Sequence, residues 1–294
     1  MRSLLFVPAD SEKKLAKGFD SGADALILDL EDSVAADRKP GARDTALAYL
    51  KEHGPRAGRP RLVVRVNALD TGLTDADLDV IVTGKPDAIL LPKAEGGPSV
   101  IHLDAKLTAR EAVHGLPDGA IEIMALATET AAALFMCGTY AGASKRLTAL
   151  TWGAEDLSAE LGSETNRDAD GRFTSPYVLA RNLSLAAAAS ARVQAIDTVY
   201  ADFRNMAGLR EESLEARRDG FTAKMAIHAA QVAVINAVFT PSADEIEKAR
   251  AVLHAFAAEP AAGVVAIGGV MYDRPHLRRA ERLLARVSNL KTSS

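Results

Sequence analysis

Two carboxylates that follow consecutive apolar runs are the strongest candidates for metal chemistry in this sequence. Glu129 follows the run 121–125, and Asp156 follows the run 147–151. If the two runs are neighbouring parallel strands about 4.8 Å apart, both carboxylates reach one point. Two close carboxylates repel each other unless a cation lies between them, and no thiol or imidazole cluster favours a softer metal than Mg²⁺. The pattern predicts a Mg²⁺ site, with the alternative that both side chains only cap the following helices.

A single guanidinium lies in an otherwise apolar run. Arg65 belongs to the run 62–66, which is suited to burial. A buried guanidinium needs an anionic partner, and it binds a carboxylate through two parallel hydrogen bonds. We therefore expect Arg65 to bind a substrate carboxylate and to take part in catalysis. The alternative is a structural ion pair with Asp29 or Glu31.

Further charged residues follow two other apolar runs. Asp29, Glu31 and Asp32 follow the run 25–28, and Lys93 follows the run 88–91. We expect Asp29 and Lys93 to bind substrate. Glu31 and Asp32 are candidates for proton transfer, because the pKa of a partly buried carboxyl group can be moved towards neutrality.

The elements that position these residues follow a repeating pattern. Eight short apolar runs alternate with charged, alanine-rich stretches of helical character, as in successive βα units; the runs are 4–7, 25–28, 62–66, 88–91, 121–125, 147–151, 195–199 and 222–227. Eight such units predict a (β/α)8 TIM barrel, in which catalytic residues lie at the carboxyl ends of the strands. Gly22, Gly84 and Gly220 precede strands where a helix would end in a left-handed residue.

The domain organisation changes after residue 240. Residues 1–240 contain the eight units, whereas residues 241–294 comprise a charged helix, a segment rich in Gly and Val and a basic amphipathic helix. We interpret residues 241–294 as a C-terminal helical extension without a core of its own, which packs on the barrel or on a neighbouring subunit.

Composition excludes several other classes of protein. The net charge of −4 and the absence of a Lys/Arg block argue against nucleic acid as a partner. No apolar segment approaches the length of roughly 18 to 20 uncharged residues that a membrane-spanning helix needs. Cys137 is the single cysteine, which excludes an internal disulfide and fits a reducing cytoplasm. No GxGxxG, Walker A, HExxH or GxSxG motif is present.

Seven segments resemble, in the same order, those of the citrate lyase β-subunit-like family of the HpcH/HpaI aldolase group, which includes relatives of malyl-CoA and citramalyl-CoA lyases. They are RSLLFVP at 2–8, LDLEDSV at 28–34, VRVN at 64–67, LPKAE at 91–95, ETA at 129–131, WGAEDL at 152–157 and KMAIH at 224–228. The resemblance implies a TIM barrel that assembles as a homotrimer or as a higher oligomer of trimers. It maps Mg²⁺ ligands onto Glu129 and Asp156 and binding of the substrate carboxylate onto Arg65.

Two further positions refine the resemblance. The segment MYDRP at 271–275 is similar to the C-terminal motif of CoA-thioester lyases, whose aspartate reaches a neighbouring subunit's active site. Asp273 is therefore expected to be catalytic. Asp32 stands where pyruvate aldolases of the wider group have a histidine base. This difference argues against a simple hydroxy-keto-acid aldolase.

These observations predict a Mg²⁺-dependent carbon–carbon lyase of a 3-hydroxyacyl-CoA, such as malyl-CoA or citramalyl-CoA. The products would be acetyl-CoA and a 2-keto acid, or the reaction would run as the reverse condensation. Asp273, or failing that Glu31 or Asp32, is the candidate for acid–base chemistry. The alternatives are the β-subunit of citrate lyase acting on a citryl acyl carrier protein, a malyl-CoA thioesterase, and a non-enzymatic regulator that binds a keto acid or CoA ester.

Overall fold

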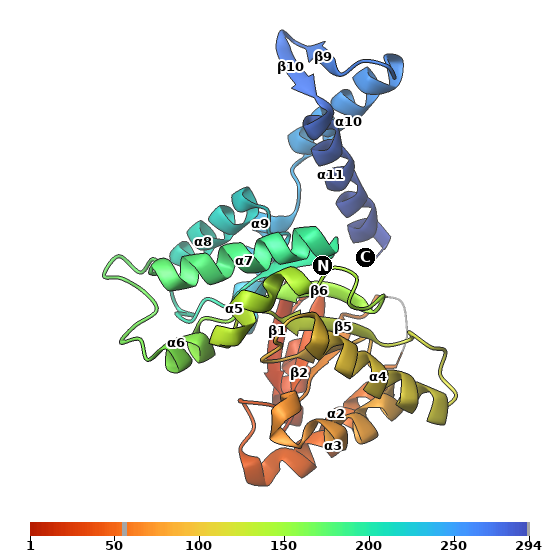
Figure 1. Ribbon diagram of the computed structural model, residues 1–294, viewed down its shortest axis with the longest axis vertical. Helices are drawn as coiled ribbons and strands as arrows, with labels where there is room; N and C mark the ends of the chain where they lie inside the picture. Colours follow the sequence, from red (N-terminus) through yellow and green to blue (C-terminus); the bar gives the residue numbers. More distant parts are fainter. Residues whose placement is uncertain (55–57, 293–294) are drawn as a thin grey trace. The chain divides into compact units, whose positions relative to one another are not determined.

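The computed structural model describes residues 1–54 and 58–292, and Figure 1 shows the chain. Two compact units are present, Met1–Asn236 and Ala237–Ser294. The expected boundary at residue 240 lies next to the end of helix α9, Ala229–Phe239. Among the described residues, no helix is both long enough and apolar enough to cross a membrane.

The first unit is built on a closed barrel of eight parallel strands, in which each strand pairs with the next and β8 pairs with β1. The strands are β1 (Ser3–Pro8), β2 (Ala25–Asp29), β3 (Arg61–Arg65), β4 (Ala88–Leu91), β5 (Glu122–Leu126), β6 (Leu147–Thr151), β7 (Gln194–Asp197) and β8 (Ala223–Ala226). Each lies at one of the eight predicted runs, so the prediction of a TIM barrel is confirmed. Runs of Val, Ile and Leu without polar alternation form these strands because both faces of each strand are covered.

Helices connect the strands and surround the barrel (Figure 1). They are α1 (Glu12–Phe19), α2 (Lys39–Glu52), α3 (Thr74–Ile81), α4 (Gly97–Val113), α5 (Ala131–Met136), α6 (Glu155–Leu161), α7 (Ser175–Ala191), α8 (Met206–Asp219) and α9, with short 3₁₀ turns η1 (Ala36–Arg38), η2 (Leu69–Thr71), η3 (Val82–Gly84) and η4 (Cys137–Thr139). Alternation of strand and helix places every strand's carboxyl end at the same mouth of the barrel.

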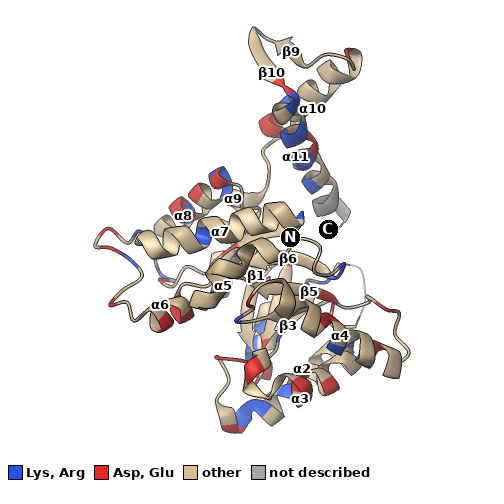
Figure 2. Ribbon diagram, in the orientation of Figure 1, with Lys and Arg blue, Asp and Glu red and all other residues tan. Residues whose placement is uncertain are grey.

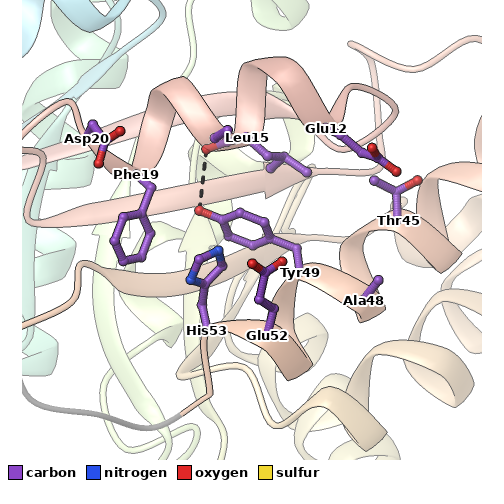
Figure 3. A pocket seen from close by; sticks show the side chains of 10 residues that line it. Glu12, Leu15, Phe19, Asp20, Thr45, Ala48, Tyr49, Glu52 and His53 are labelled. Carbon is purple, nitrogen blue, oxygen red and sulfur yellow. Dashed lines mark hydrogen bonds between the residues drawn. The ribbon is translucent and has the colours of Figure 1, made fainter.

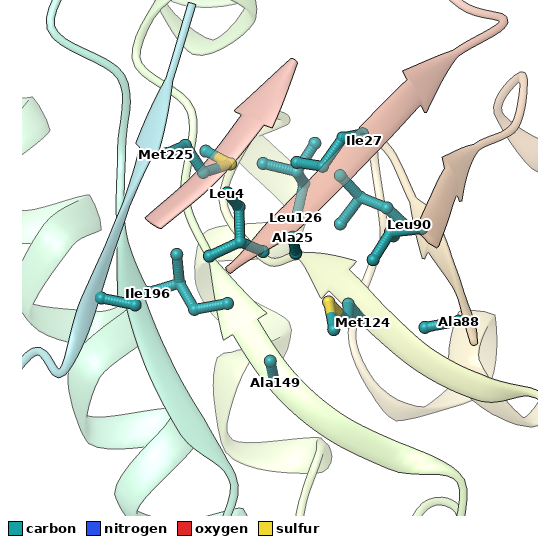
Figure 4. Close-up of a cluster of buried hydrophobic side chains, with 12 residues drawn as sticks. Leu4, Ala25, Ile27, Ala88, Leu90, Met124, Leu126, Ala149, Ile196 and Met225 are labelled. Carbon is teal, nitrogen blue, oxygen red and sulfur yellow. The ribbon is translucent and has the colours of Figure 1, made fainter. Parts of the chain in front are cut away.

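The barrel interior is filled by side chains rather than open (Figure 4). Leu4, Ile27, Leu90, Met124 and Ile196 are among the inward-facing residues, and each is at most 1% exposed. Such close packing holds the strand ends in fixed positions, so that polar residues beyond them meet reproducibly.

One glycine has a different role from the one predicted. Gly220, the C-cap of α8, and Gly22, two residues after the C-cap of α1, have positive φ angles of 125° and 76°. At the third position the left-handed residue is Lys85, with φ of 54°, and not Gly84. A Cβ atom on Gly84 would lie 2.9 Å from the Leu50 side chain. Gly84 is therefore needed for close packing against α2.

The second unit contains α10 (Ala243–Ala258), a hairpin of β9 (Val264–Ile267) and β10 (Val270–Asp273), and α11 (Arg274–Thr292). Ser242 and Glu245 form a capping box at the start of α10. Figure 2 shows the basic residues along α11. A small cluster that includes Val252, Phe256 and Val265 is buried within this unit. The expectation that it lacks a core was therefore wrong, since the hairpin supplies an apolar partner for the helices.

A cavity of about 420 Å³ lies between α1 and α2, outside the barrel (Figure 3). The Phe19 and Tyr49 rings pack against His53, with centroids 4.5 and 4.3 Å away. Tyr49 Oη donates a hydrogen bond of 3.4 Å to the Leu15 carbonyl. Phe19 ends α1 and His53 follows α2, and both helices return to the amino ends of strands. This cavity is therefore separate from the carboxyl ends, where chemistry is expected.

Candidate active site

A second cavity, of about 260 Å³, opens where the strands end. Its walls come from residues at or after β1, β2, β3, β5, β6, β7 and β8; they include Phe6, Asp29, Asp32, Arg65, Leu126, Glu129, Asp156, Arg167, Phe173, Thr198 and Met225. Most of the predicted site residues of the barrel unit thus line one cavity. Glu31 and Lys93 are not part of its wall, but both contact residues that are.

Glu129 lies three residues after the end of β5 and is 4% exposed. One of its oxygens, Oε2, accepts a hydrogen bond of 2.7 Å from the backbone N–H of Lys93. Burial raises the pKa of Glu129, and the charges of Asp156 and Glu31 raise it further, against the backbone hydrogen bond and Arg65. Helix α5 is capped by Thr130, whose side chain accepts from the Ala133 N–H. Glu129 is therefore not the cap of α5.

Asp156 lies in the first turn of α6, directly after Glu155, and the N-cap position of α6 is Ala154. Because β5 and β6 are paired in parallel, with Leu126 beside Thr151, Asp156 and Glu129 follow adjacent strand ends. The buried Trp152 anchors this connection, since its indole N–H donates a hydrogen bond of 2.8 Å to Asp197. The alternative thus fails for Glu129, whereas Asp156 does lie in the first turn of α6, where the helix dipole favours a carboxylate.

The two carboxylates fit a divalent oxygen-ligated cation. Among the described residues, no group of three or more His, Cys, Asp or Glu is arranged to hold a metal. Mg²⁺ needs only one or two protein carboxylates, because it retains waters and binds substrate oxygens. A Cβ atom at Gly153 would lie 2.9 Å from Glu129 Oε1, so glycine leaves room for this carboxylate. The donor set suits Mg²⁺ and excludes a thiolate-bound metal.

Arg65 makes a two-pronged ion pair with Asp29. Its Nε and Nη2 donate to the two oxygens of Asp29 at 2.7 Å, because the register of β2 and β3 places these residues side by side. Nη1 lies 2.8 Å from Glu31 Oε2. A guanidinium has five N–H donors, and the hydrogen bonds to Asp29 use two of them. The ion pair that the alternative predicted is thus present, and contact of Arg65 with a substrate carboxylate stays a prediction.

The pKa values of the two acidic partners move in opposite directions. Burial alone would raise the pKa of Asp29, but the hydrogen bonds and charge of Arg65 lower it below its usual value. Burial raises the pKa of Glu31 even though Arg65 and Lys93 oppose the shift. Asp29 is therefore a fixed anion that holds Arg65, whereas Glu31 is better suited to carry a proton.

Lys93 connects the acidic residues of the mouth. Its Nζ lies 2.6 Å from Glu31 Oε1, 3.3 Å from Asp156 Oδ1 and 3.5 Å from Asp32 Oδ2. Its backbone has φ of 49°, a left-handed conformation that is uncommon for a lysine. Burial lowers the pKa of Lys93, but Glu31, Asp156 and Asp32 raise it more, so the net pKa lies above the usual value and Lys93 remains a cation.

Asp273 ends β10 in the second unit. Its carboxylate contacts the imidazole of His276, whose hydrogen bond lowers the pKa of Asp273. The side chain is 41% exposed. Its predicted catalytic role stays a prediction.

The sequence analysis missed part of the cavity wall. Arg167 and Phe173 come from the long connection between α6 and α7, and the Arg167 guanidinium lies 3.8 Å from the centroid of the Phe173 ring. Arg167 also forms an ion pair of 2.8 Å with Glu212. This connection has no periodic pattern, and only its position after the sixth strand would have indicated these residues.

Comparison with known proteins decides the family. The model of the HpcH/HpaI aldolase/citrate lyase family matches residues 2–229. The chain belongs to this family. A (3S)-malyl-CoA thioesterase of Cereibacter sphaeroides is 37% identical, with 97% of this chain and 94% of the relative covered. The mitochondrial citramalyl-CoA lyase of Rattus norvegicus is 30% identical, covering 99% and 87% respectively. The names of these two relatives describe action on citramalyl-CoA and on (3S)-malyl-CoA.

A solved structure of the same family also matches. The Mycobacterium tuberculosis protein CitE in complex with magnesium, acetoacetate and coenzyme A superposes with a TM-score of 0.76 and 33% identity, over 98% of each chain. The predicted resemblance to the citrate lyase β-subunit-like family is therefore confirmed.

Proposed function

We propose that this protein is a Mg²⁺-dependent carbon–carbon lyase that cleaves a 3-hydroxyacyl-CoA of the malyl-CoA or citramalyl-CoA type to acetyl-CoA and a 2-keto acid. The reverse condensation would use the same groups. One observation carries the proposal: two carboxylates suited to Mg²⁺, Glu129 and Asp156, share a cavity with the oriented guanidinium of Arg65. A hydroxy-acid substrate presents a hydroxyl and a carboxylate, which match this pair of sites.

The chain's own residues bind and orient the substrate in this proposal. Arg65 binds the carboxylate of the keto-acid portion through the N–H groups outside its contacts with Asp29 and Glu31. The Phe6 ring, 4.8 Å from the Arg65 guanidinium, and the apolar Leu126 and Met225 exclude water around this contact. Held by Glu129 and Asp156, Mg²⁺ would supply a Lewis acid that neutralises charge on the keto-acid oxygens.

Proton transfer is the remaining requirement. Cleavage removes the proton of the 3-hydroxyl group, breaks the carbon–carbon bond and leaves an acetyl-CoA enolate that takes up a proton. Asp32 lines the cavity, with a side chain that is 57% exposed. Glu31 forms ion pairs with Arg65 and Lys93. We retain Asp273 as the first candidate for the base, followed by Glu31 and Asp32, and Asp29 and Lys93 as substrate-binding residues.

A panel of thioesters tests this function. Purified protein is incubated with malyl-CoA, citramalyl-CoA or 3-hydroxybutyryl-CoA, with Mg²⁺ or with EDTA. We expect Mg²⁺-dependent formation of acetyl-CoA together with glyoxylate or pyruvate from the first two, and no reaction of 3-hydroxybutyryl-CoA, which lacks the carboxylate that Arg65 would bind. Failure of every carboxylated thioester to turn over with Mg²⁺ would overturn the proposal.

The same experiment separates the alternatives. Free CoA with malate as products would indicate the thioesterase activity that the Cereibacter sphaeroides relative's name describes. Cleavage of a citryl acyl carrier protein but of no CoA ester would indicate a citrate lyase β-subunit. Tight binding of a keto acid or CoA ester without turnover would indicate a regulator. We further propose a homotrimer or an oligomer of trimers, located in the cytoplasm, which sedimentation and cell fractionation test.

A further inference from the structure

Lys93 contacts both candidate metal ligands, one through its backbone and the other through its side chain. The backbone N–H donates to Glu129 Oε2 at 2.7 Å, whereas Nζ lies 3.3 Å from Asp156 Oδ1. The left-handed backbone at φ of 49° follows directly after Pro92 at the end of β4. This conformation allows one residue to direct its amide and its ammonium at the acidic groups of the mouth.

The balance of charges around Lys93 makes its ammonium a competitor for the metal. Asp29, Asp32, Glu129, Glu155 and Asp156 line the cavity with the cations Arg65 and Arg167, while Glu31 and Lys93 contact residues of its wall. Lys93 Nζ forms an ion pair with Asp156 at 3.3 Å, whereas the ion pairs of Arg65 are with Asp29 and Glu31. A divalent ion bound to Asp156 would share this carboxylate with the ammonium, and the two like charges would repel each other.

We propose that Lys93 is a positioning residue that sets the Mg²⁺ affinity of this site. The Lys93 ammonium competes with the metal for Asp156. When the metal binds, the ammonium leaves Asp156 and keeps its contacts with Glu31 and Asp32, while the Lys93 backbone N–H still donates to Glu129. This inference rests on the proposed function, because it requires a metal at Glu129 and Asp156. Its consequence is a weakened affinity, which suits a metal that must also exchange ligands with substrate.

The decisive variant removes the ammonium and keeps the amide. Lys93→Asn has no positive charge, and asparagine tolerates a left-handed backbone. We expect Lys93→Asn to bind Mg²⁺ at least about tenfold more tightly than the unmodified protein in isothermal titration calorimetry. Removal of a like charge at this distance changes the equilibrium constant of a bound ion by roughly one to three powers of ten. Damage to the site would instead weaken binding.

Two variants serve as controls. Lys85→Asn changes the same residue type in the same left-handed conformation, φ of 54°, before β4 instead of after it. Lys93→Arg keeps the positive charge at the site. We expect the Mg²⁺ affinity of both to stay within about twofold of the unmodified protein, because neither changes the charge beside Asp156.

The outcomes distinguish this inference from the proposed function. If the unmodified protein binds Mg²⁺ and Glu129→Gln abolishes binding, but Lys93→Asn binds no more tightly, the inference is wrong and the metal site stands. If the unmodified protein does not bind Mg²⁺, the proposed function itself fails. Should Lys93→Asn not fold, as judged by circular dichroism, Lys93→Gln takes its place and the same tightening is required of it.

Discussion

At the scale of single residues, excess negative charge dominates the mouth of the barrel. The carboxylates of Asp29, Asp32, Glu129, Glu155 and Asp156 line the cavity with two guanidinium groups, those of Arg65 and Arg167, and Glu129 is only 4% exposed. Charges of one sign are costly to bury together, so an additional cation stabilises the arrangement. This reasoning leads to a direct test of the two ligands.

Glu129→Gln and Asp156→Asn should each weaken Mg²⁺ binding by at least about 100-fold, or roughly 2.7 kcal/mol, because each removes one of only two anionic ligands. The overall fold should persist, since both side chains lie at the mouth and not in the core. Calorimetric titration with Mg²⁺ measures the affinity. Glu160→Gln, on the exposed side of α6, is the control and should bind Mg²⁺ normally. Tight binding by either ligand variant would remove that residue from the metal site.

The pair formed by Asp29 and Arg65 predicts a dependence of stability on pH. Because the pKa of Asp29 is lowered in the folded state, its ionised form contributes stability above the unfolded value near 3.8, and this contribution disappears as pH falls through the folded pKa. Asp29→Asn should therefore cost about 3 kcal/mol of unfolding free energy at pH 7, as expected for a broken buried pair, and less at pH 3, which lies below the unfolded value.

Urea unfolding at both pH values measures this difference. Asp75→Asn is the matched control, because Asp75 forms an ion pair with Lys106 but has a side chain that is 57% exposed. Its effect should stay below about 1 kcal/mol at either pH. An equal cost of Asp29→Asn at pH 7 and pH 3 would show that the ionised pair does not stabilise the fold.

At the scale of elements, the turn between β6 and α6 determines where Glu129 can lie. Gly153 occupies this turn, and a Cβ atom there would come within 2.9 Å of Glu129 Oε1 and 3.0 Å of its Cγ. The element that provides Asp156 thus also leaves room for the carboxylate from the neighbouring strand. The positions of both candidate ligands therefore depend on the lack of a side chain at residue 153.

Gly153→Ala should displace the Glu129 carboxylate and weaken Mg²⁺ binding by about tenfold, with a cost in stability of roughly 1 to 2 kcal/mol from overpacking. Gly41→Ala is the control, because a Cβ atom there would meet nothing within 4 Å and alanine is the better residue inside helix α2. Mg²⁺ titration and urea unfolding of both variants provide the comparison. Normal Mg²⁺ affinity of Gly153→Ala would show that Glu129 does not depend on this space.

At the scale of the whole molecule, the candidate acid–base residue and the candidate metal ligands belong to different units. Asp273 belongs to the unit Ala237–Ser294, whereas the proposed metal and carboxylate contacts all belong to Met1–Asn236. If Asp273 acts on a neighbouring subunit's barrel, Asp273→Ala should lose turnover by at least about 100-fold, while it still binds Mg²⁺ and keto acid.

Mixing subunits tests this arrangement. Asp273→Ala and Glu129→Gln subunits, each inactive alone, should regain partial activity in mixed oligomers, because some interfaces then pair an intact barrel with an intact Asp273. Two observations contradict the idea: full turnover by Asp273→Ala, or a fully active monomer in sedimentation. Inactivity of verified mixed oligomers would assign Asp273 to its own barrel.

The sequence by itself determined the barrel and the approximate place of its candidate site. Runs of Val, Ile and Leu covered on both faces predict buried parallel strands, and charged residues that follow them must gather at one mouth. Glu129, Asp156 and Arg65 could be named as candidates on this basis. The small core of the C-terminal unit could not be predicted, because its apolar residues are divided between two helices and a short hairpin.

Only the tertiary structure decided how the charged groups pair. The bond from Arg65 to Asp29 depends on the register between β2 and β3, and the position of the Lys93 ammonium depends on a left-handed backbone that a lysine rarely adopts. Arg167 enters the cavity from a connection without periodicity. These contacts form between residues that are far apart in the chain. They depend on closure of the barrel and on the length and direction of each side chain, and a local pattern of residue types contains neither kind of information.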